Sequence, residues 1–402
     1  MSDGLQERIN QHIHQLITEI GPRMIGTPAN RSAAKYIYDQ FGESDIAVKL
    51  QRFDCVTWSA EPPIIAIGEE TADHHTVVNT FSPPCEVTAP MVACNSLAQL
   101  ANASLVGKIV LLYGDLTKQP IAPKGHPFYM PEHHRRINEL LDAKRPSAAI
   151  LVSPRFVDPL PIIEDWDIVI PSVTVSAANG IWLLKNLDKN VRLTILTEHS
   201  MGQGRNVIAT IPGERPERIV ICAHFDTKIN TPGAVDNGAA VVALLALAAE
   251  LAKQPHNATI EFIAFNGEEY YGLGDTEYLR NYESTFPSII AAINMDGIGQ
   301  WTGTSTAAAL AHSEAFGQTL SEVVQTYPSV IITDPWYASN HYTFFSRGVP
   351  SIAISSIGVD DIGHFVWDDI GWLDPNKIAE VVNFVIELVK RLDTKSIAWT
   401  RP

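Results

Sequence analysis

Histidine and acidic residues stand at or just after the ends of successive apolar segments of this sequence. They are His224, Asp226, Asp236, Glu268, Glu269, Asp296 and His364. Any one of them alone is more simply a helix cap or a solvated loop residue. Together, four apolar strands in a row would deliver carboxylates and imidazoles to one sheet edge, where open α/β sheets bind ligands. Gathered carboxylates raise one another's pKa values unless a cation lies among them, so the pattern predicts a metal site.

The residue types indicate which metal the site would hold. Two imidazoles with several carboxylates and no thiolate favour zinc, and less strongly manganese or cobalt, over calcium or magnesium. The set is large enough for two ions. His224 and Asp296 would hold one ion, His364 and Glu269 the other, and Asp236 would bridge them.

Two acidic residues, Asp226 and Glu268, are left over from the ligand set, and each fits a role that such a metal site requires. Asp226, two residues after His224, is placed to orient that imidazole through its other ring nitrogen. Glu268 and Glu269 are adjacent, so their side chains point in different directions. One can bind metal while the other, Glu268, faces the substrate as a general base that takes a proton from the attacking water.

The elements that must position these residues follow from the apolar pattern. Residues 5–19 are helical, Gly21-Pro22 breaks the helix, and Asn30 is expected to cap a second one. After about residue 205, apolar strands alternate with amphipathic helices. The pattern predicts an α/β fold, with a largely buried, mostly parallel mixed sheet between two helix layers.

The middle of the chain has a different character. Short β-like runs lie between proline-rich turns. They are residues 48–53, 64–67, 108–113, 148–152, 172–175 and 191–197. We therefore expect a β-rich inserted domain over residues 48–198 and a discontinuous main domain over 1–47 and 199–402.

Composition narrows the class of protein. The 402 residues are 46% hydrophobic and 18% charged, which is typical of a globular chain. With 29 basic and 45 acidic residues, the net charge of -16 disfavours nucleic acid and anionic membranes as partners. Residues 238–249 form the most apolar stretch, shorter than the ~20 residues that span a bilayer.

Four cysteines without a CxxC pair, and a polar start, predict a cytosolic protein unless a leader has been removed.

The motifs HFD, PGAVDNGAA, FNGEEYYGLG, NMDG and the late histidine, in this order, resemble the bacterial leucyl aminopeptidases. These belong with the glutamate carboxypeptidases to the di-zinc exopeptidases of clan MH. The resemblance covers residues 205–392, and the segment GPRMIGTPANRSAAKYIYDQF resembles the family's N-terminal helix region. It implies a three-layer α/β/α zinc-exopeptidase fold and a substrate peptide with a free N-terminus. Residues 48–198 resemble, more weakly, a protease-associated domain.

Carried over residue by residue, the resemblance implies the same metal ligands and the same base, Glu268. It also implies a cis peptide between Asp236 and Asn237. Tyr337 is near the position of a tyrosine that stabilises the oxyanion in relatives, at a different local spacing. Asn340 stands where the family usually has an aspartate, which leaves open what replaces that carboxylate.

Other functions stay open from the sequence. One is a carboxypeptidase that releases glutamate, although the long C-terminal helical domain of such relatives has no counterpart in the 38 residues after His364 (402 minus 364). Another is a glutaminyl cyclase, whose relatives use a single zinc. The alternative of another class is a receptor-like binding protein, whose relatives have lost the ligands that this chain keeps.

Overall fold

A computed structural model of the chain describes residues 3–44, 46–124, 130–156 and 158–402. The chain divides into two compact units. The larger unit runs up to Cys55 and again from Gly202 to Pro402, and the inserted unit is Val56–Met201. The expected limits of 48–198 lie a few residues away, because both crossings fall inside long strands, β1 (Ala47–Ala60) and β10 (Thr197–Ile211).

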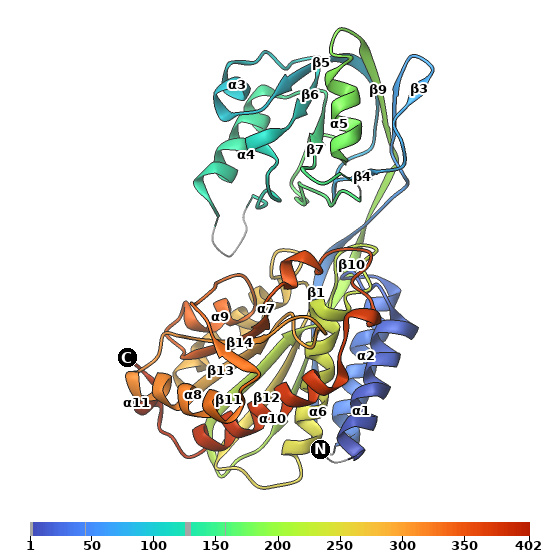
Figure 1. Ribbon diagram of the computed structural model, residues 1–402. Helices are drawn as coiled ribbons and strands as arrows, with labels where there is room; N and C mark the ends of the chain where they lie inside the picture. The colour runs from blue at the N-terminus through green and yellow to red at the C-terminus, as the bar shows by residue number, and fades with distance from the viewer. Residues whose placement is uncertain (1–2, 45, 125–129, 157) are drawn as a thin grey trace. The chain divides into compact units, whose positions relative to one another are not determined.

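Eight strands of the larger unit form one mixed sheet, in the order β1-β10-β12-β11-β13-β16-β14-β15 (Figure 1). The four central strands, β12, β11, β13 and β16, run parallel to one another, whereas β10 and β14 are antiparallel to their central neighbours. The remaining strands are β11 (Arg215–His224), β12 (Ala258–Phe265), β13 (Ile289–Met295), β14 (Ser305–Leu310), β15 (Val330–Ile332) and β16 (Ser351–Ser356).

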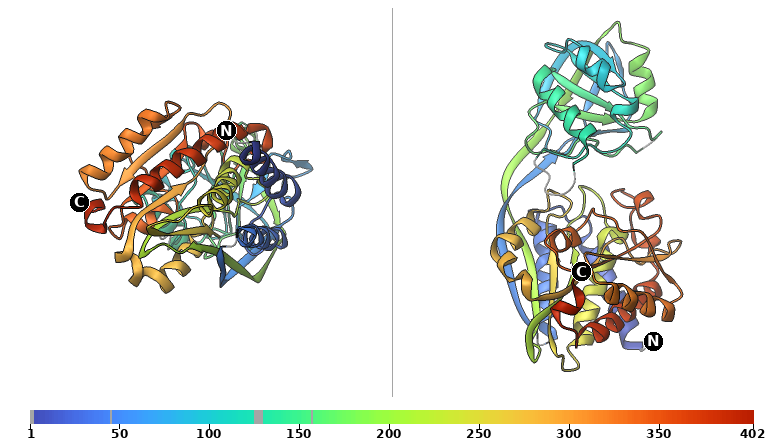
Figure 2. Two further views of the ribbon diagram at one scale, coloured as in Figure 1. Left: turned by 90° about the horizontal axis from the view of Figure 1, so that it is seen from below. Right: turned by 90° about the vertical axis from the view of Figure 1, so that its left-hand side faces the viewer.

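The central strands of this sheet are buried on both faces, which is why they read as continuous apolar runs. In β11, Ile219, Ile221 and Ala223 pack into the cluster that contains α1, α6, α8 and α10. Val220 and Cys222 pack into a second cluster with α7, η4 and α9. In the left view of Figure 2, α8 (orange), α10 (red), α6 (yellow-green) and α1 (dark blue) lie along one face of the sheet.

These helices have the following bounds: α6 (Ala239–Leu251), α7 (Leu273–Tyr282), η4 (Glu283–Ser288), α8 (Glu314–Thr326), α9 (His341–Phe345), α10 (Pro375–Leu392) and α11 (Ile397–Thr400). The predicted three-layer α/β/α architecture around a mostly parallel mixed sheet is confirmed.

The helix α6 and the short element before it, η3 (Ala234–Gly238), form the most apolar helical stretch. Among the described residues, only this stretch, Ala234–Leu251, is long and apolar enough to cross a membrane. Its burial within the structure is 89%. This is the pattern of a core helix, hydrophobic all round because it is covered all round.

The N-terminal segment forms α1 (Asp3–Ile13), η1 (His14–Ile20) and α2 (Pro28–Glu43). The expected cap of α2 was wrong. Thr27 is the N-cap and accepts from the backbone N–H of Asn30, with Pro28 at the first helical position. Asn30 instead exchanges two side-chain hydrogen bonds, both 2.9 Å, with the buried Asn266 just after β12.

The inserted unit contains its own sheet, in the order β3-β2-β9-β5-β6-β7-β8-β4, with β5 to β8 parallel. Its apolar cluster fills the space between this sheet and the helices α3 and α4. Its elements are β2 (Ile64–Ile67), β3 (Glu70–Thr71), β4 (Thr76–Val78), β5 (Cys85–Cys94), α3 (Leu97–Asn102), β6 (Ile109–Leu112), η2 (Gly114–Leu116), α4 (Glu132–Lys144), β7 (Ala148–Val152), β8 (Ser172–Val175), α5 (Ala177–Leu184) and β9 (Asn190–Ile195). The protease-associated resemblance of this unit stays a prediction.

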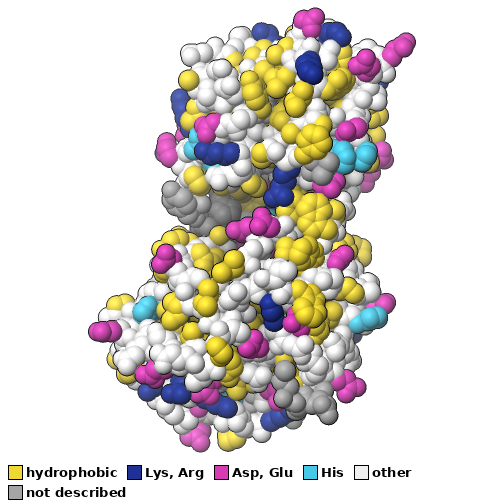
Figure 3. All heavy atoms as spheres, viewed as in Figure 1, with side chains coloured by type: hydrophobic (Ala, Val, Ile, Leu, Met, Phe, Trp, Pro, Cys, Tyr) yellow, Lys and Arg dark blue, Asp and Glu magenta, His cyan; other side chains and the backbone are white. Residues whose placement is uncertain are grey.

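On the face drawn in Figure 3, acidic side chains are dispersed over the surface, in keeping with the net charge of -16.

Candidate metal centre

The predicted ligands lie where the central parallel strands end. His224 is the last residue of β11, Asp296 directly follows β13, and Glu269 follows β12 by four positions. Asp236 lies in η3, at the beginning of the long core helix, and His364 lies in the loop after β16. Because these strands are parallel neighbours, their carboxyl ends meet at one edge of the sheet.

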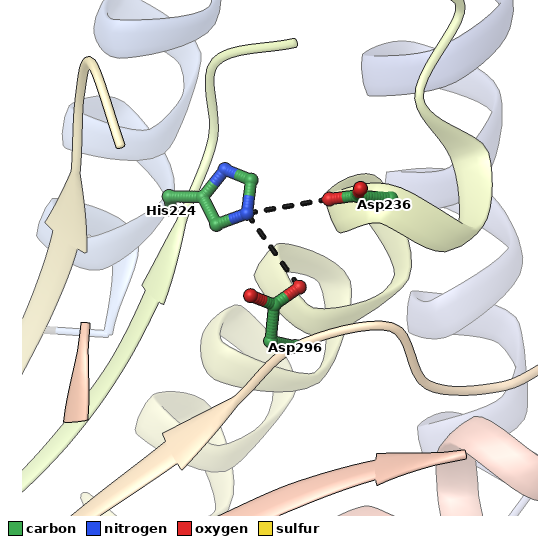
Figure 4. A group of neighbouring side chains, drawn as sticks. All are labelled: His224, Asp236 and Asp296. Carbon is green, nitrogen blue, oxygen red and sulfur yellow. Dashed lines mark ion pairs between the residues drawn. The ribbon is translucent and has the colours of Figure 1, made fainter. Parts of the chain in front are cut away.

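The first group of ligand atoms surrounds His224 (Figure 4). Its Nε2 atom lies 3.3 Å from Oδ1 of Asp236 and 3.6 Å from Oδ1 of Asp296. The side chain of His224 is almost completely buried, with 1% exposed. Figure 4 shows the imidazole and both carboxylates directed toward one point.

The second group surrounds His364. Its Nε2 atom lies 3.1 Å from Oδ2 of Asp236 and 3.1 Å from Oε2 of Glu269. His364 is 43% exposed, so solvent reaches the site from this side. Its backbone φ of +69° lies in the left-handed region that non-glycine residues seldom adopt, a strain that is common at functional sites. Asp236 belongs to both groups and meets each histidine with a different oxygen.

These groups fit zinc. Ligand atoms at 2.0–2.2 Å from a tetrahedral ion are roughly 3.4 Å apart, close to the separations of the facing atoms here. Oε1 of Glu269 is buried and has no hydrogen-bond partner within the described residues, which a cation would supply. His224, Asp236 and Asp296 would hold one ion, and Asp236, Glu269 and His364 another.

The charges in the site also favour a cation. Burial lowers the pKa of His224, but the negative charges of Asp296 and Glu268 outweigh burial and raise it well above its ordinary value. His364 behaves in the same way beside Glu269 and Asp236. Both imidazoles therefore lie in a field that attracts positive charge, which a divalent ion would provide in place of two protons.

Asp226 makes a different contact from the one expected. Nδ1 of His224 lies 3.2 Å from the backbone carbonyl of Asp226, whereas the Asp226 carboxylate is 3.7 Å away, beyond hydrogen-bonding distance. That carboxylate accepts from the backbone N–H groups of Glu268 and Glu269, each at 3.2 Å. It therefore fixes the loop that carries the predicted base and a predicted ligand.

Asp368 was not predicted. Its carboxylate accepts from the backbone N–H groups of Val235 at 2.8 Å and Asp236 at 3.0 Å. Burial raises the pKa of Asp368 to about 7. It holds the backbone of the bridging residue from the loop that also carries His364. The acidic pair in WDD, four residues after that histidine, is the sequence signal that could have indicated it.

Arg23 was not predicted either, although it lies in the GPR motif of the N-terminal segment. Its guanidinium is fully buried and donates to four backbone carbonyls. These are Phe225 at 2.6 Å, Pro232 at 2.7 Å, Gly233 at 2.8 Å and Gly21 at 3.1 Å. Three of them lie in the loop between His224 and Asp236, so Arg23 shapes the path between two predicted ligands.

Tyr337 is not brought into contact with the ligands in the part of the chain that the structure describes. The side chain is 54% exposed, and its ring lies 5.5 Å from that of Phe345. Its role as an oxyanion donor stays a prediction. The peptide between Asp236 and Asn237 is cis, as the resemblance implied.

Residues 206–389 match Peptidase family M28. The chain is 26% identical over 291 residues to a protein of Mycobacterium tuberculosis named "Probable lipoprotein aminopeptidase LpqL", covering 69% of this chain and 55% of that one. It is 25% identical over 374 residues to aminopeptidase YwaD of Bacillus subtilis, covering 89% and 74%. Carboxypeptidase Q of Xenopus laevis is 23% identical over 398 residues, covering 90% and 79%. The chain thus spans little more than half of the first relative.

Among solved structures, the chain is similar to BSAP, a zinc aminopeptidase from Bacillus subtilis, with a TM-score of 0.77 and 20% identity. The likeness covers 99% of this chain and 98% of that one and shows a shared fold. The matched stretch of sequence holds every predicted metal ligand. Over residues 206–389, the chain is thus similar to peptidase family M28.

Proposed function

We propose that this chain is a metal-dependent aminopeptidase that removes the N-terminal residue of peptides at a site for two zinc ions. The observation that carries the proposal is the sharing of Asp236 between two donor groups, one oxygen to each. The M28 match and the aminopeptidase names of two relatives support the reaction. Manganese or cobalt could substitute for zinc, because the same nitrogen and oxygen donors suit them.

In the proposed mechanism, Glu268 is the general base. A bound zinc ion would polarise the scissile carbonyl and lower the pKa of water at the site. Glu268 lies beside the first donor group, with Oε2 3.9 Å from Nε2 of His224, and belongs to neither group. Its carboxylate takes a proton from the attacking water and later gives it to the leaving amine.

The surroundings of Glu268 suit this proton transfer. Burial raises the pKa of Glu268 well above its usual range, which strengthens it as a base. The Asp226 carboxylate accepts a hydrogen bond from the backbone N–H of Glu268, and this contact fixes the position of Glu268 in the loop. Tyr337 is proposed to donate to the oxyanion of the tetrahedral intermediate, a role that requires its exposed hydroxyl to reach the bound substrate.

The first experiment measures release of the N-terminal residue from short peptides and from N-acetylated copies of the same peptides. The protein is tested as purified, after chelation, and after zinc is added back. An aminopeptidase cleaves only the free-amine peptides, loses activity on chelation and regains it with zinc. Equal cleavage of the acetylated copies would contradict the proposal.

Glu268→Gln tests the base separately from the metal. The amide cannot accept the proton, so we expect kcat to fall by at least about 100-fold while zinc content stays unchanged. Glu283→Gln is the matched control, because Glu283 is an exposed glutamate of the same unit that pairs with Arg347. Near-normal turnover of the Glu268→Gln enzyme would show that another group is the base.

Carboxypeptidase activity is the second candidate. Carboxypeptidase Q covers more of this chain than the two aminopeptidases do, although at lower identity. The same peptides distinguish the two functions, because a carboxypeptidase releases the C-terminal residue and is indifferent to N-acetylation.

A further inference from the structure

The buried Asp275 lies against the residue at which this sequence departs from the family pattern. Asn340 donates from Nδ2 to Oδ2 of Asp275 at 2.8 Å, and Thr343 donates from Oγ1 to Oδ1 at 2.6 Å. Asp275 is 2% exposed, and Asn340 is completely buried. The position that usually carries a carboxylate therefore carries an amide here, and that amide binds a carboxylate from another helix.

This pair connects two parts of the metal centre. Asp275 lies in the first turn of α7, which follows the loop of Glu268 and Glu269. Asn340 lies between Ser339 and His341, and both of these contact Asn294. Nδ2 of Asn294 is 2.9 Å from Oγ of Ser339 and 3.3 Å from Nδ1 of His341. Asn294 precedes Asp296 by two positions, at the end of β13.

Only one of the two positions can carry a charge. Two carboxylates 2.8 Å apart in a buried place cannot both ionise, because desolvation and repulsion act together. A carboxylate and an amide form a matched acceptor and donor instead. The burial of Asp275 raises its pKa to about 6, which shows how poorly the site would accept a second acid.

We propose that Asp275 is a positioning residue of the metal centre, and that it supplies from α7 the carboxylate which the family pattern places at residue 340. It holds the loop of Glu268 and Glu269 in register with the end of β13. This inference rests on the proposed function for its activity measurement, but not for its metal-binding measurement.

The test exchanges the two groups. N340D alone sets two carboxylates against each other, and D275N alone leaves two amides. Each should lower kcat by about 10- to 100-fold with a smaller change in KM, and should weaken zinc retention during dialysis. The double variant D275N/N340D restores one carboxylate and one amide, and should recover most of both losses.

A matched pair elsewhere in the same unit controls for stability. The Asp393 carboxylate accepts a hydrogen bond from Nδ2 of Asn257 at 2.9 Å. Asn257 directly precedes β12, so this pair lies at the opposite end of that strand from the metal centre. D393N should lower the thermal midpoint but leave kcat and zinc retention unchanged. Should N340D fail to fold, T343V removes the other donor to Asp275. It should lower kcat and zinc retention, while T343S should keep both.

Recovery in the exchanged variant supports the inference. A double variant no better than the single ones, or single variants that change only the thermal midpoint, would overturn it. Where the parent protein cleaves no peptide, the proposed function fails on its own, and zinc retention across the four proteins still decides whether Asp275 positions the site.

Discussion

At the scale of single residues, the proposal of a two-ion site depends on Asp236, because its two oxygens face different histidines. Oδ1 faces the buried His224, and Oδ2 faces the more exposed His364. Asp368 fixes the orientation by holding the backbone N–H groups of Val235 and Asp236. A carboxylate whose backbone is fixed, and whose two oxygens face different histidines, is suited to bridge two cations.

Metal content should therefore depend differently on the bridging and the terminal ligands. We expect two zinc ions per wild-type chain and about one in Asp296→Asn, which loses a ligand of only one group. Asp236→Asn should retain less zinc than Asp296→Asn, because its amide offers one acceptor oxygen in place of two and adds an N–H donor that repels a cation.

Elemental analysis after dialysis, with circular dichroism to verify folding, measures both variants. Asp334→Asn is the control, an exposed aspartate of the same unit. Two ions retained by Asp236→Asn would show that Asp236 is not shared.

The sequence singled out residues that the structure brings together, but it did not indicate their contacts. Histidine and acidic residues at strand ends are visible in a sequence because β11, β12 and β13 are short, apolar and regular. Asp226 was singled out, but its use of a backbone carbonyl toward His224 depends on how the chain turns after β11. Asp368 and Arg23 bind backbone groups, and the sequence does not identify such partners, although the acidic pair after Trp367 marks where Asp368 lies.

At the scale of elements, Arg23 joins the N-terminal segment to the loop that follows β11. Its fully buried guanidinium donates hydrogen bonds to four backbone carbonyls. Burial lowers the pKa of Arg23 to about 10, while the negative charges of Asp368 and Asp226 oppose that shift. Its charge thus lies beside the acidic centre, and its hydrogen bonds hold the loop.

Replacing Arg23 should destabilise the larger unit. Arg23→Met removes one donor from each of four backbone carbonyls, three of them in buried contacts, and removes the buried charge. We therefore expect a loss of about 3 kcal/mol in the free energy of unfolding. Urea titration with a chelator present measures this loss apart from any loss of metal. Arg31→Met is the control, because Arg31 is exposed and donates to one carbonyl, that of Gly26. Equal stability of the two variants would refute the structural role of Arg23.

Strands and helices were predictable from the sequence where the pattern of apolar residues was regular. The alternation of strands and helices after residue 205 predicted the mixed sheet, because the apolar runs of its central strands are buried on both faces. In the inserted unit the prediction missed β5, a ten-residue strand paired with β6 and β9. Pro90 interrupts that segment and argues against a strand inside a sheet, although Glu86 and Thr88 alternate with apolar residues as in a strand. Its partner β9 is also distant in sequence.

At the scale of the whole molecule, buried histidines link folding to pH. His12 lies in α1 with 2% of its surface exposed, and its Nδ1 atom is 2.7 Å from the hydroxyl of Tyr36. Burial lowers the pKa of His12 to about 4 from the ordinary 6.5, and the charge of Arg8 adds to the effect. In the unfolded chain the same imidazole is free to take a proton near pH 6.5.

The sign of the effect follows from proton binding. Below pH 6.5 the unfolded chain holds more protons than the folded one, so the free energy of unfolding falls as the pH falls, until the folded His12 titrates near pH 4. The difference between the two pKa values corresponds to about 2 kcal/mol at pH 5 relative to pH 8. His12→Gln removes this titration. Between pH 8 and pH 5, its free energy of unfolding should therefore fall by about 2 kcal/mol less than that of the wild type. His14→Gln, at an exposed position two residues along, should lose as much as the wild type. Urea titrations at pH 5 and pH 8 with a chelator present measure these losses. Equal losses in all three proteins would mean that the pKa of His12 is the same in the folded and the unfolded chain.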